Sequence, residues 1–177
     1  SKKCFDNINK NVPEHIIIQE WNDLRNIMWS QNGIVSPKRF VHYIQKLAEE
    51  KDRQLFTGWA QNDLPEFLLF IVECMHNSIS RSVKMNINGK PNGETDDLAI
   101  SCYQMLKNIY TKEYSEIMEL FYGIYVSELT SSDGTIVHSV RPESYSMLDL
   151  ELPKKTPTLY DCFDSFTCYE KLEGENA

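Results

Sequence analysis

The fold is decided by residues 58–76, GWAQNDLPEFLLFIVECMH, where a polar segment runs directly into a long apolar one. Asp63 is a good helix N-cap, and Glu66 follows three residues later, which is the spacing of a capping box. Pro65 falls in the first turn, where its missing N–H costs little. Apolar residues then recur every three or four positions as far as Ile79. We therefore predict a helix that starts after Asp63 and is buried on most sides.

Composition limits the classes of protein and partner. The chain has 177 residues, of which 41% are hydrophobic and 25% charged, as in one globular domain or a large piece of one. Its formal net charge of −8 argues against nucleic acids and anionic membranes as main partners. No apolar run reaches the roughly 18 residues that span a bilayer, and no signal-peptide pattern is present. Five cysteines without a CxxC pair fit a reducing, intracellular setting.

Segments on both sides of residues 58–76 also have helical patterns. Residues 14–30 carry one apolar stripe, and Ser36 with Pro37 is a typical start of a second helix. Thr95 is expected to cap a later helix, and residues 116–120 form a short one. Near the end of the chain a second capping box begins a last helix or turn that Gly174 terminates. The stripe of residues 14–30 consists of Ile17, Trp21, Leu24 and Met28. The second capping box consists of Thr158 and Asp161.

After Phe121 the apolar period changes from about four residues to two. Residues 121–129 and 135–140 predict two paired strands, joined by the hairpin loop 130–134. Residues 145–153 alternate in the same way and predict a third strand. Helices come first and antiparallel strands follow, so the predicted fold class is α+β.

The sequence offers little for metal, phosphate or serine chemistry. The four histidines are scattered, Cys162 and Cys168 lie too far apart for a zinc knuckle, and no GxGxxG, P-loop or GxSxG motif occurs. Cys74 and His76 are two residues apart on a predicted helix, so their side chains point to different faces. We expect Cys74 to be a core thiol, and we predict no cofactor and no metal.

The carboxylates of Asp63 and Glu66 leave two interpretations open. Both can act only as caps, hydrogen-bonded to backbone N–H groups at the helix start. A carboxylate pair at an exposed helix start can also bind a guanidinium group through two hydrogen bonds. Spacing and composition do not decide between them.

The order of several motifs resembles the ubiquitin-specific protease family, that is, cysteine-type deubiquitinases of the peptidase C19 kind. Four of the seven residues in the family's Gln-Gln-Asp-Ala-Gln-Glu-Phe box occur here, after a matching Phe-x-Gly. The similarity covers about residues 14–177 and is strongest to compact, divergent members from large DNA viruses and protists. The matched residues are Ser36, Pro37 and Phe40; Phe56 and Gly58; Gln61, Asp63, Glu66 and Phe67; Leu120, Phe121 and Gly123; and Glu170, Leu172, Gly174, Glu175 and Asn176.

The resemblance implies part of a papain-like ubiquitin-specific protease fold, a helical thumb followed by antiparallel strands of a short palm and fingers region. Residues 1–177 would form a single partial catalytic domain. Its expected parts are thumb-side helices (14–82), a surface loop (83–94), a helical segment (95–120), antiparallel strands (121–152), and a helix with a closing turn (158–174). A zinc ribbon is not expected, because Thr-Ser-Ser-Asp-Gly stands where the family has its first CxxC pair.

The resemblance also implies a function. The family hydrolyses the bond after ubiquitin's C-terminal glycine with a Cys–His–Asp/Asn triad, and its box carboxylates contact ubiquitin's basic tail. By position, Asp63 and Glu66 would bind tail arginines and Gln61 would support them. The partners would be ubiquitin or ubiquitinated proteins, in the cytoplasm or nucleus, of a host cell or in a virion.

The triad itself has no clear match. Cys4-Phe5-Asp6-Asn7 resembles the Cys-Phe-x-Asn part of the nucleophile motif, but Gly-Asn-Thr does not precede it and no Gly-His-Tyr occurs. We therefore assign no catalytic residue within the 177 residues. Two alternatives remain open: a catalytically inactive ubiquitin-binding or scaffold protein on the same fold, and an unrelated helical interaction module in which both boxes are only caps.

Overall fold

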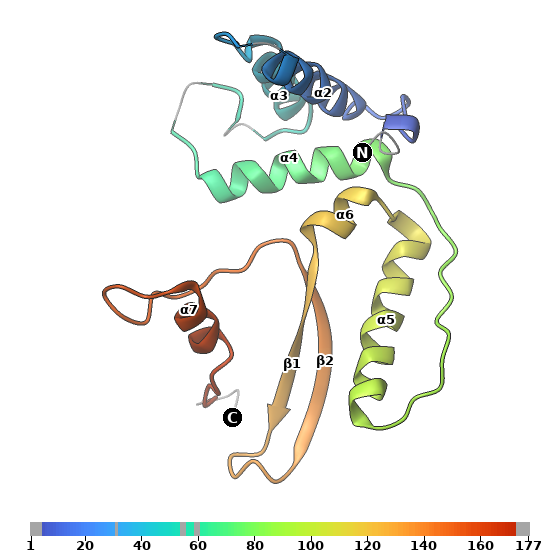
Figure 1. Ribbon diagram of the computed structural model, residues 1–177, viewed down its shortest axis with the longest axis vertical. Helices are drawn as coiled ribbons and strands as arrows, with labels where there is room; N and C mark the ends of the chain where they lie inside the picture. Colours follow the sequence, from blue (N-terminus) through green and yellow to red (C-terminus); the bar gives the residue numbers. More distant parts are fainter. Residues whose placement is uncertain (1–4, 31, 54–55, 59–60, 173–177) are drawn as a thin grey trace. The chain divides into compact units, whose positions relative to one another are not determined.

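A computed structural model describes residues 5–30, 32–53, 56–58 and 61–172 (Figure 1). The chain divides into two compact units, residues 1–123 and 124–177. The described residues of the first unit are largely helical, and those of the second hold a two-stranded antiparallel sheet and a helix. The predicted α+β class is therefore confirmed.

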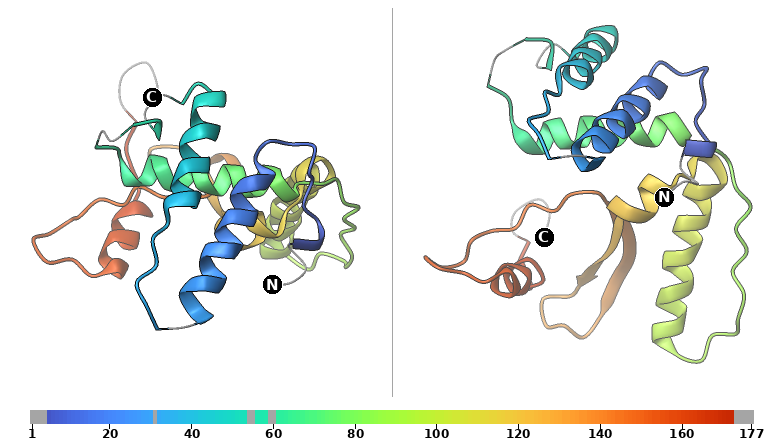
Figure 2. Two further views of the ribbon diagram at one scale, coloured as in Figure 1. Left: turned by 90° about the horizontal axis from the view of Figure 1, so that it is seen from above. Right: turned by 45° about the horizontal axis from the view of Figure 1, so that its top comes forward.

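Three helices form the centre of the first unit: α2 (His15–Ser30), α3 (Lys38–Glu50) and α4 (Leu64–Ile79). Helices α2 and α3 lie on the same side of α4, and α2 packs against both (Figures 1 and 2). Their apolar faces meet in one core. The buried members of this core are Ile17, Ile44, Leu47, Ala48, Phe56, Phe70 and Cys74.

A second, smaller core joins α2 and α4 to the short helix α6 (Glu116–Phe121). Ile18, Ile79 and Ile117 are its buried members. The preceding helix, α5 (Glu94–Glu113), has no buried residue. A pair of backbone hydrogen bonds between Arg81 and Tyr114, 2.8 and 2.9 Å long, ties the end of α5 to the residues that follow α4.

The predicted start of α4 is confirmed, and the prediction that it is buried on most sides is wrong. Oδ1 of Asp63 accepts the N–H of Glu66 at 3.1 Å, which is one of the two bonds of a capping box. Leu64, Leu68 and Leu69 are 65%, 46% and 41% exposed. These leucines remain exposed because α2 and α3 cover the opposite face of the helix.

Two other predicted caps are displaced. Helix α3 begins at Lys38 with Pro37, not Ser36, at the cap position, and no side chain caps it. Pro37 has a φ of −80° and a ψ of 25°, and this ψ is not helical, so the first helical residue is Lys38. At α5 the cap position is occupied by Gly93, and Thr95 lies inside the helix. Gly93 has a φ of 117°, a value that favours glycine.

The second unit contains the predicted hairpin and the last helix. Strands β1 (Gly123–Thr130) and β2 (Val137–Tyr145) pair, and the helix is α7 (Leu159–Phe166). Both bonds of the predicted capping box between Thr158 and Asp161 are present at its start. Gly174, which was expected to end this helix, lies outside the described residues.

The predicted third strand is wrong. Residues 147–153 are not in a strand, and the sheet has two strands among the described residues. Alternation alone could not reveal this, because a strand also needs a neighbour to bond with. The alternating segment instead contributes its first residue, Tyr145, to the end of β2.

Candidate functional site

The predicted site residues Gln61, Asp63 and Glu66 all lie exposed at the N-terminal end of α4. Asp63 has extended backbone geometry, with φ −70° and ψ 126°, and its Oδ1 serves the helix cap. Its Oδ2 and the Glu66 carboxylate bind no other residue in the described part of the chain. The two side chains are therefore exposed at one helix start, and within the described residues three of their four carboxylate oxygens have no partner.

Aromatic packing holds the segment before these carboxylates. The buried ring of Phe56 stacks on Phe70, with centroids 5.2 Å apart, and meets the edge of Phe67 at 5.6 Å. Phe67 directly follows Glu66 in the first turn of α4. Next to Phe56, the carbonyl of Gly58 accepts a hydrogen bond from Nε2 of Gln45 on α3 at 3.3 Å. The Phe-x-Gly motif is thus anchored to the core beside the helix start.

The start of α4 presents two carboxylates to solvent. The N-terminal end of a helix is electropositive and attracts acidic side chains, and α4 has Asp63 and Glu66 there. Their free oxygens are acceptors, and a guanidinium group supplies paired donors with matching geometry. These side chains alone offer binding and positioning, without a nucleophile.

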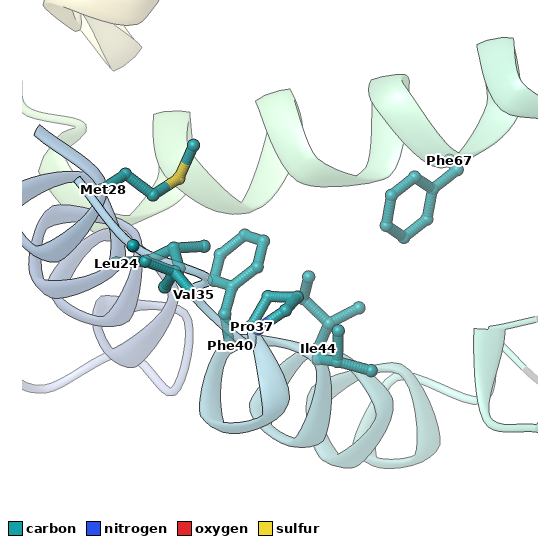
Figure 3. Close-up of a pocket in the computed structure, with 9 residues that line it drawn as sticks. Leu24, Met28, Val35, Pro37, Phe40, Ile44 and Phe67 are labelled. Atoms are coloured by element: carbon teal, nitrogen blue, oxygen red, sulfur yellow. The ribbon is translucent and has the colours of Figure 1, made fainter.

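An apolar pocket of about 570 Å³ also lies in the first unit (Figure 3). It is formed by α2, the segment leading to α3, α3 itself and the first turn of α4. Asp63 and Glu66 do not line it, and no lining residue titrates, so the pocket can hold apolar groups but offers no acid–base chemistry. The lining residues are Leu24, Met28, Gly33, Val35, Pro37, Phe40, Val41, Ile44 and Phe67.

The sequence did not predict this pocket. The helical stripe correctly assigned Leu24 to an apolar face, but a stripe does not say how tightly two helices pack against each other. Half of Met28 is exposed although it belongs to the predicted stripe of α2. Because the opening depends on the distance between helices, no signal in the sequence could have indicated it.

The described thiols do not form a nucleophilic centre. Cys74 is fully buried, and burial raises the pKa of its thiol to about 12, so it stays protonated. His76 directs Nδ1 to Ser115, not to Cys74, as expected from their spacing. No cysteine in the described residues is hydrogen-bonded to a histidine, and Cys4 lies outside those residues.

The described residues contain neither a cluster of metal ligands nor a membrane-spanning helix. No three His, Cys, Asp or Glu side chains in this part of the chain gather as metal ligands would. In the same residues, every helix is too short or too polar to cross a bilayer.

A buried carboxylate that the sequence analysis missed, that of Glu14, links residues at α2, α3 and α4. Oε1 of Glu14 accepts from Nζ of Lys51 at 2.6 Å and from Nδ2 of Asn77 at 3.3 Å. Burial alone would raise the pKa of Glu14, but the hydrogen bonds and the charge of Lys51 prevail and lower it. The three residues come from distant parts of the sequence, so their spacing gave no signal.

Comparisons with known proteins place this chain beside one family. The family profile described as "Ubiquitin carboxyl-terminal hydrolase" matches residues 1–136. "Ubiquitin carboxyl-terminal hydrolase 2" from Bos taurus is 30% identical over 169 residues, and the Homo sapiens protein of that name is 30% identical over 170; each alignment covers 90% of this chain and 26% of the relative. "Ubiquitin carboxyl-terminal hydrolase 21" from Homo sapiens is 29% identical over 186 residues, which cover 91% of this chain and 31% of the relative. The chain thus spans about a quarter of the length of the first relatives.

Proposed function

Because the chain belongs to the ubiquitin carboxyl-terminal hydrolase family, as part of a ubiquitin-specific protease catalytic domain, we propose that it is part of a deubiquitinating thiol protease. The protein would hydrolyse the bond after ubiquitin's C-terminal glycine. The observation that carries this proposal is the family match over residues 1–136, which is most of the chain.

The start of α4 is the proposed contact for the basic tail of ubiquitin. Asp63 and Glu66 are exposed, adjacent and negatively charged, and their free oxygens are suited to arginine side chains. Gln61 lies two residues before Asp63, where its amide can add a hydrogen bond. Asp63 would then serve the helix with one oxygen and the tail with the other.

The proposed chemistry is that of a cysteine protease. A thiolate attacks the carbonyl carbon of the glycine, an imidazole takes and returns the proton, and hydrogen-bond donors hold the developing oxyanion. The protonated Cys74 is excluded from this role by its burial. We propose no catalytic residue among those described.

The tail contact is tested by Asp63→Asn combined with Glu66→Gln in the full chain. Asparagine is as good an N-cap as aspartate, so α4 keeps its start while the site loses both charges. Hydrogen bonds to charged groups contribute about 1.5–3 kcal/mol each, so affinity for ubiquitin should fall at least about tenfold. Titration calorimetry measures the affinity, and circular dichroism checks the fold.

Glu49→Gln with Glu50→Gln is the matched control, because it removes two exposed charges from the end of α3. This control should bind ubiquitin like the unaltered chain. Unchanged affinity in a well-folded Asp63→Asn, Glu66→Gln protein would contradict the tail contact while leaving the family assignment intact.

An inactive ubiquitin-binding protein is the second candidate. It shares the family match, and no cysteine in the described residues is hydrogen-bonded to a histidine. The two candidates differ in their reaction with ubiquitin that carries an electrophile in place of its C-terminal carboxyl group.

For an enzyme we expect the full-length protein to form one covalent adduct with this ubiquitin, visible as a mass shift. The Cys74→Ala variant should form it equally well, because the buried thiol of Cys74 is protonated and out of reach. A protein that binds ubiquitin but is never labelled would favour the inactive candidate. Labelling that disappears with Cys74→Ala in a folded protein would overturn the structural role given to this thiol.

The remaining parts of the proposal follow the family. Ubiquitin or ubiquitinated proteins are the proposed partners, and the proposed location is intracellular. Helices α2, α3 and α4 would belong to the thumb, and the hairpin of β1 and β2 to short, zinc-free fingers. A viral or protist source stays a prediction, since the relatives named above come from cattle and humans.

A further inference from the structure

One buried polar pair lies between α4 and α6. Nδ1 of His76 is 2.8 Å from Oγ of Ser115, and the two residues are 7% and 0% exposed. The same Oγ accepts the N–H of Met118 at 3.1 Å and so caps α6. A single hydroxyl group therefore joins helix α4 to the first turn of α6.

The hydrogen-bond pattern indicates where the protons lie. Oγ of Ser115 accepts from Met118, and its own hydrogen needs an acceptor. The unprotonated Nδ1 of His76 is the only acceptor that the described residues place within reach of it. The ring is therefore neutral with its hydrogen on Nε2, an assignment inferred from the network.

We infer that His76 and Ser115 form an acid-sensitive link between α4 and α6. A proton on Nδ1 turns this nitrogen from an acceptor into a donor, and the Ser115 hydroxyl group loses the acceptor for its own hydrogen. A charged ring would also lie in a buried position, where charge is disfavoured. The inference goes beyond the proposed function and does not depend on it.

Burial sets the direction of the effect, against the charges around the ring. Burial lowers the pKa of His76, and the carboxylates of Glu113 on α5 and Glu73 on α4 oppose this only in part. On α6, the Glu116 carboxylate is held by Arg81 through bonds of 2.7 and 2.9 Å. Those hydrogen bonds from Arg81 lower the pKa of Glu116, so it stays ionised while His76 titrates.

The sign of the pH dependence follows from this direction. Well above the ordinary histidine pKa of 6.5, the ring is neutral in both the folded and the unfolded chain, and the link is intact. As the pH falls below that value, the unfolded chain takes up the proton first. Stability is therefore lost progressively until the pH has also passed the lower pKa of the folded state.

The amide of Met118 reports on the link directly. We expect its protection against hydrogen exchange in the full chain, corrected for the intrinsic exchange rate, to fall between about pH 7.5 and about pH 5. Complete loss of a helix N-cap would correspond to a fall of about 2- to 30-fold, and because Oγ of Ser115 keeps a lone pair for Met118, this range is the upper limit. In His76→Asn, whose amide can replace Nδ1 without titrating, protection should not change with pH over this range.

The matched control is His42→Asn, which removes an exposed histidine from α3 and should keep the pH dependence of the unaltered chain. Flat protection in the unaltered chain, or the same fall in His76→Asn, would overturn the inference. An NMR titration of the unaltered chain decides the matter even if the variant does not fold: the His76 ring and the Met118 amide should share one midpoint below 6.5. Two separate midpoints would contradict the link.

Discussion

Phe70→Ala is expected to lower the free energy of unfolding of the first unit by about 3–5 kcal/mol. Phe70 is buried in the core of α2, α3 and α4, and its ring stacks on that of Phe56. The substitution removes the apolar contacts of the ring and leaves a cavity that the three helices close only in part. Urea denaturation followed by circular dichroism measures the difference.

Leu68→Ala is the matched control on the same helix. Leu68 is 46% exposed on the face of α4 that α2 and α3 do not cover, so its removal should change stability several-fold less. Equal losses from the two variants would mean that the exposed face of α4 is covered in solution. That result would contradict the division of α4 into a buried face with Phe70 and an exposed face with Leu68.

Glu14→Ala should destabilise the first unit by an amount near the lower end of about 3–5 kcal/mol, the range for removing one partner of a buried ion pair. The Glu14 side chain is 8% exposed and that of Lys51 is 28% exposed, so the stranded ammonium group recovers some hydration. Nδ2 of Asn77 also loses its acceptor. Thermal unfolding at neutral pH measures the loss.

Glu50→Ala tests the same chemistry on the surface. Nζ of Lys46 lies 3.9 Å from Oε1 of Glu50, one helical turn away on α3, and both side chains are exposed. Such pairs contribute about 0.2–0.5 kcal/mol, so this variant should be almost as stable as the unaltered chain. If Glu14→Ala were equally mild, the pair of Glu14 and Lys51 would contribute no more than a surface pair.

The features that the sequence predicted correctly are local ones. The starts of α4 and α7 depend on residues three positions apart, Asp63 with Glu66 and Thr158 with Asp161; both bonds of the capping box form at α7 and one of them forms at α4. The hairpin of β1 and β2 depends on a change of period and a short polar loop. In each case the interacting atoms lie within a few residues along the chain, so spacing alone determines the geometry.

The features that the sequence did not predict depend on distant residues. The exposure of Leu64 and Leu68 follows from which face of α4 the other helices cover, and periodicity shows that a face is apolar without saying what covers it. The pair of Glu14 and Lys51 joins two helix ends, and no motif marks it. The missing third strand has the same cause, since alternation does not supply a partner strand.

The candidate site was predicted as a set of residues, and its surroundings were not. Spacing and resemblance named Gln61, Asp63 and Glu66, and the structure places all three exposed at one helix start. The stacking of Phe56 on Phe70, which holds the segment in front of them, was not predicted, because ring contacts depend on the packed core.

The two carboxylate oxygens of Asp63 are in different surroundings. Oδ1 satisfies the backbone of α4, and Oδ2 faces solvent. Asparagine or serine would meet the first requirement equally well and would supply no outward charge. A relative with asparagine or serine at this position would therefore keep the cap of the helix and lose the outward negative charge.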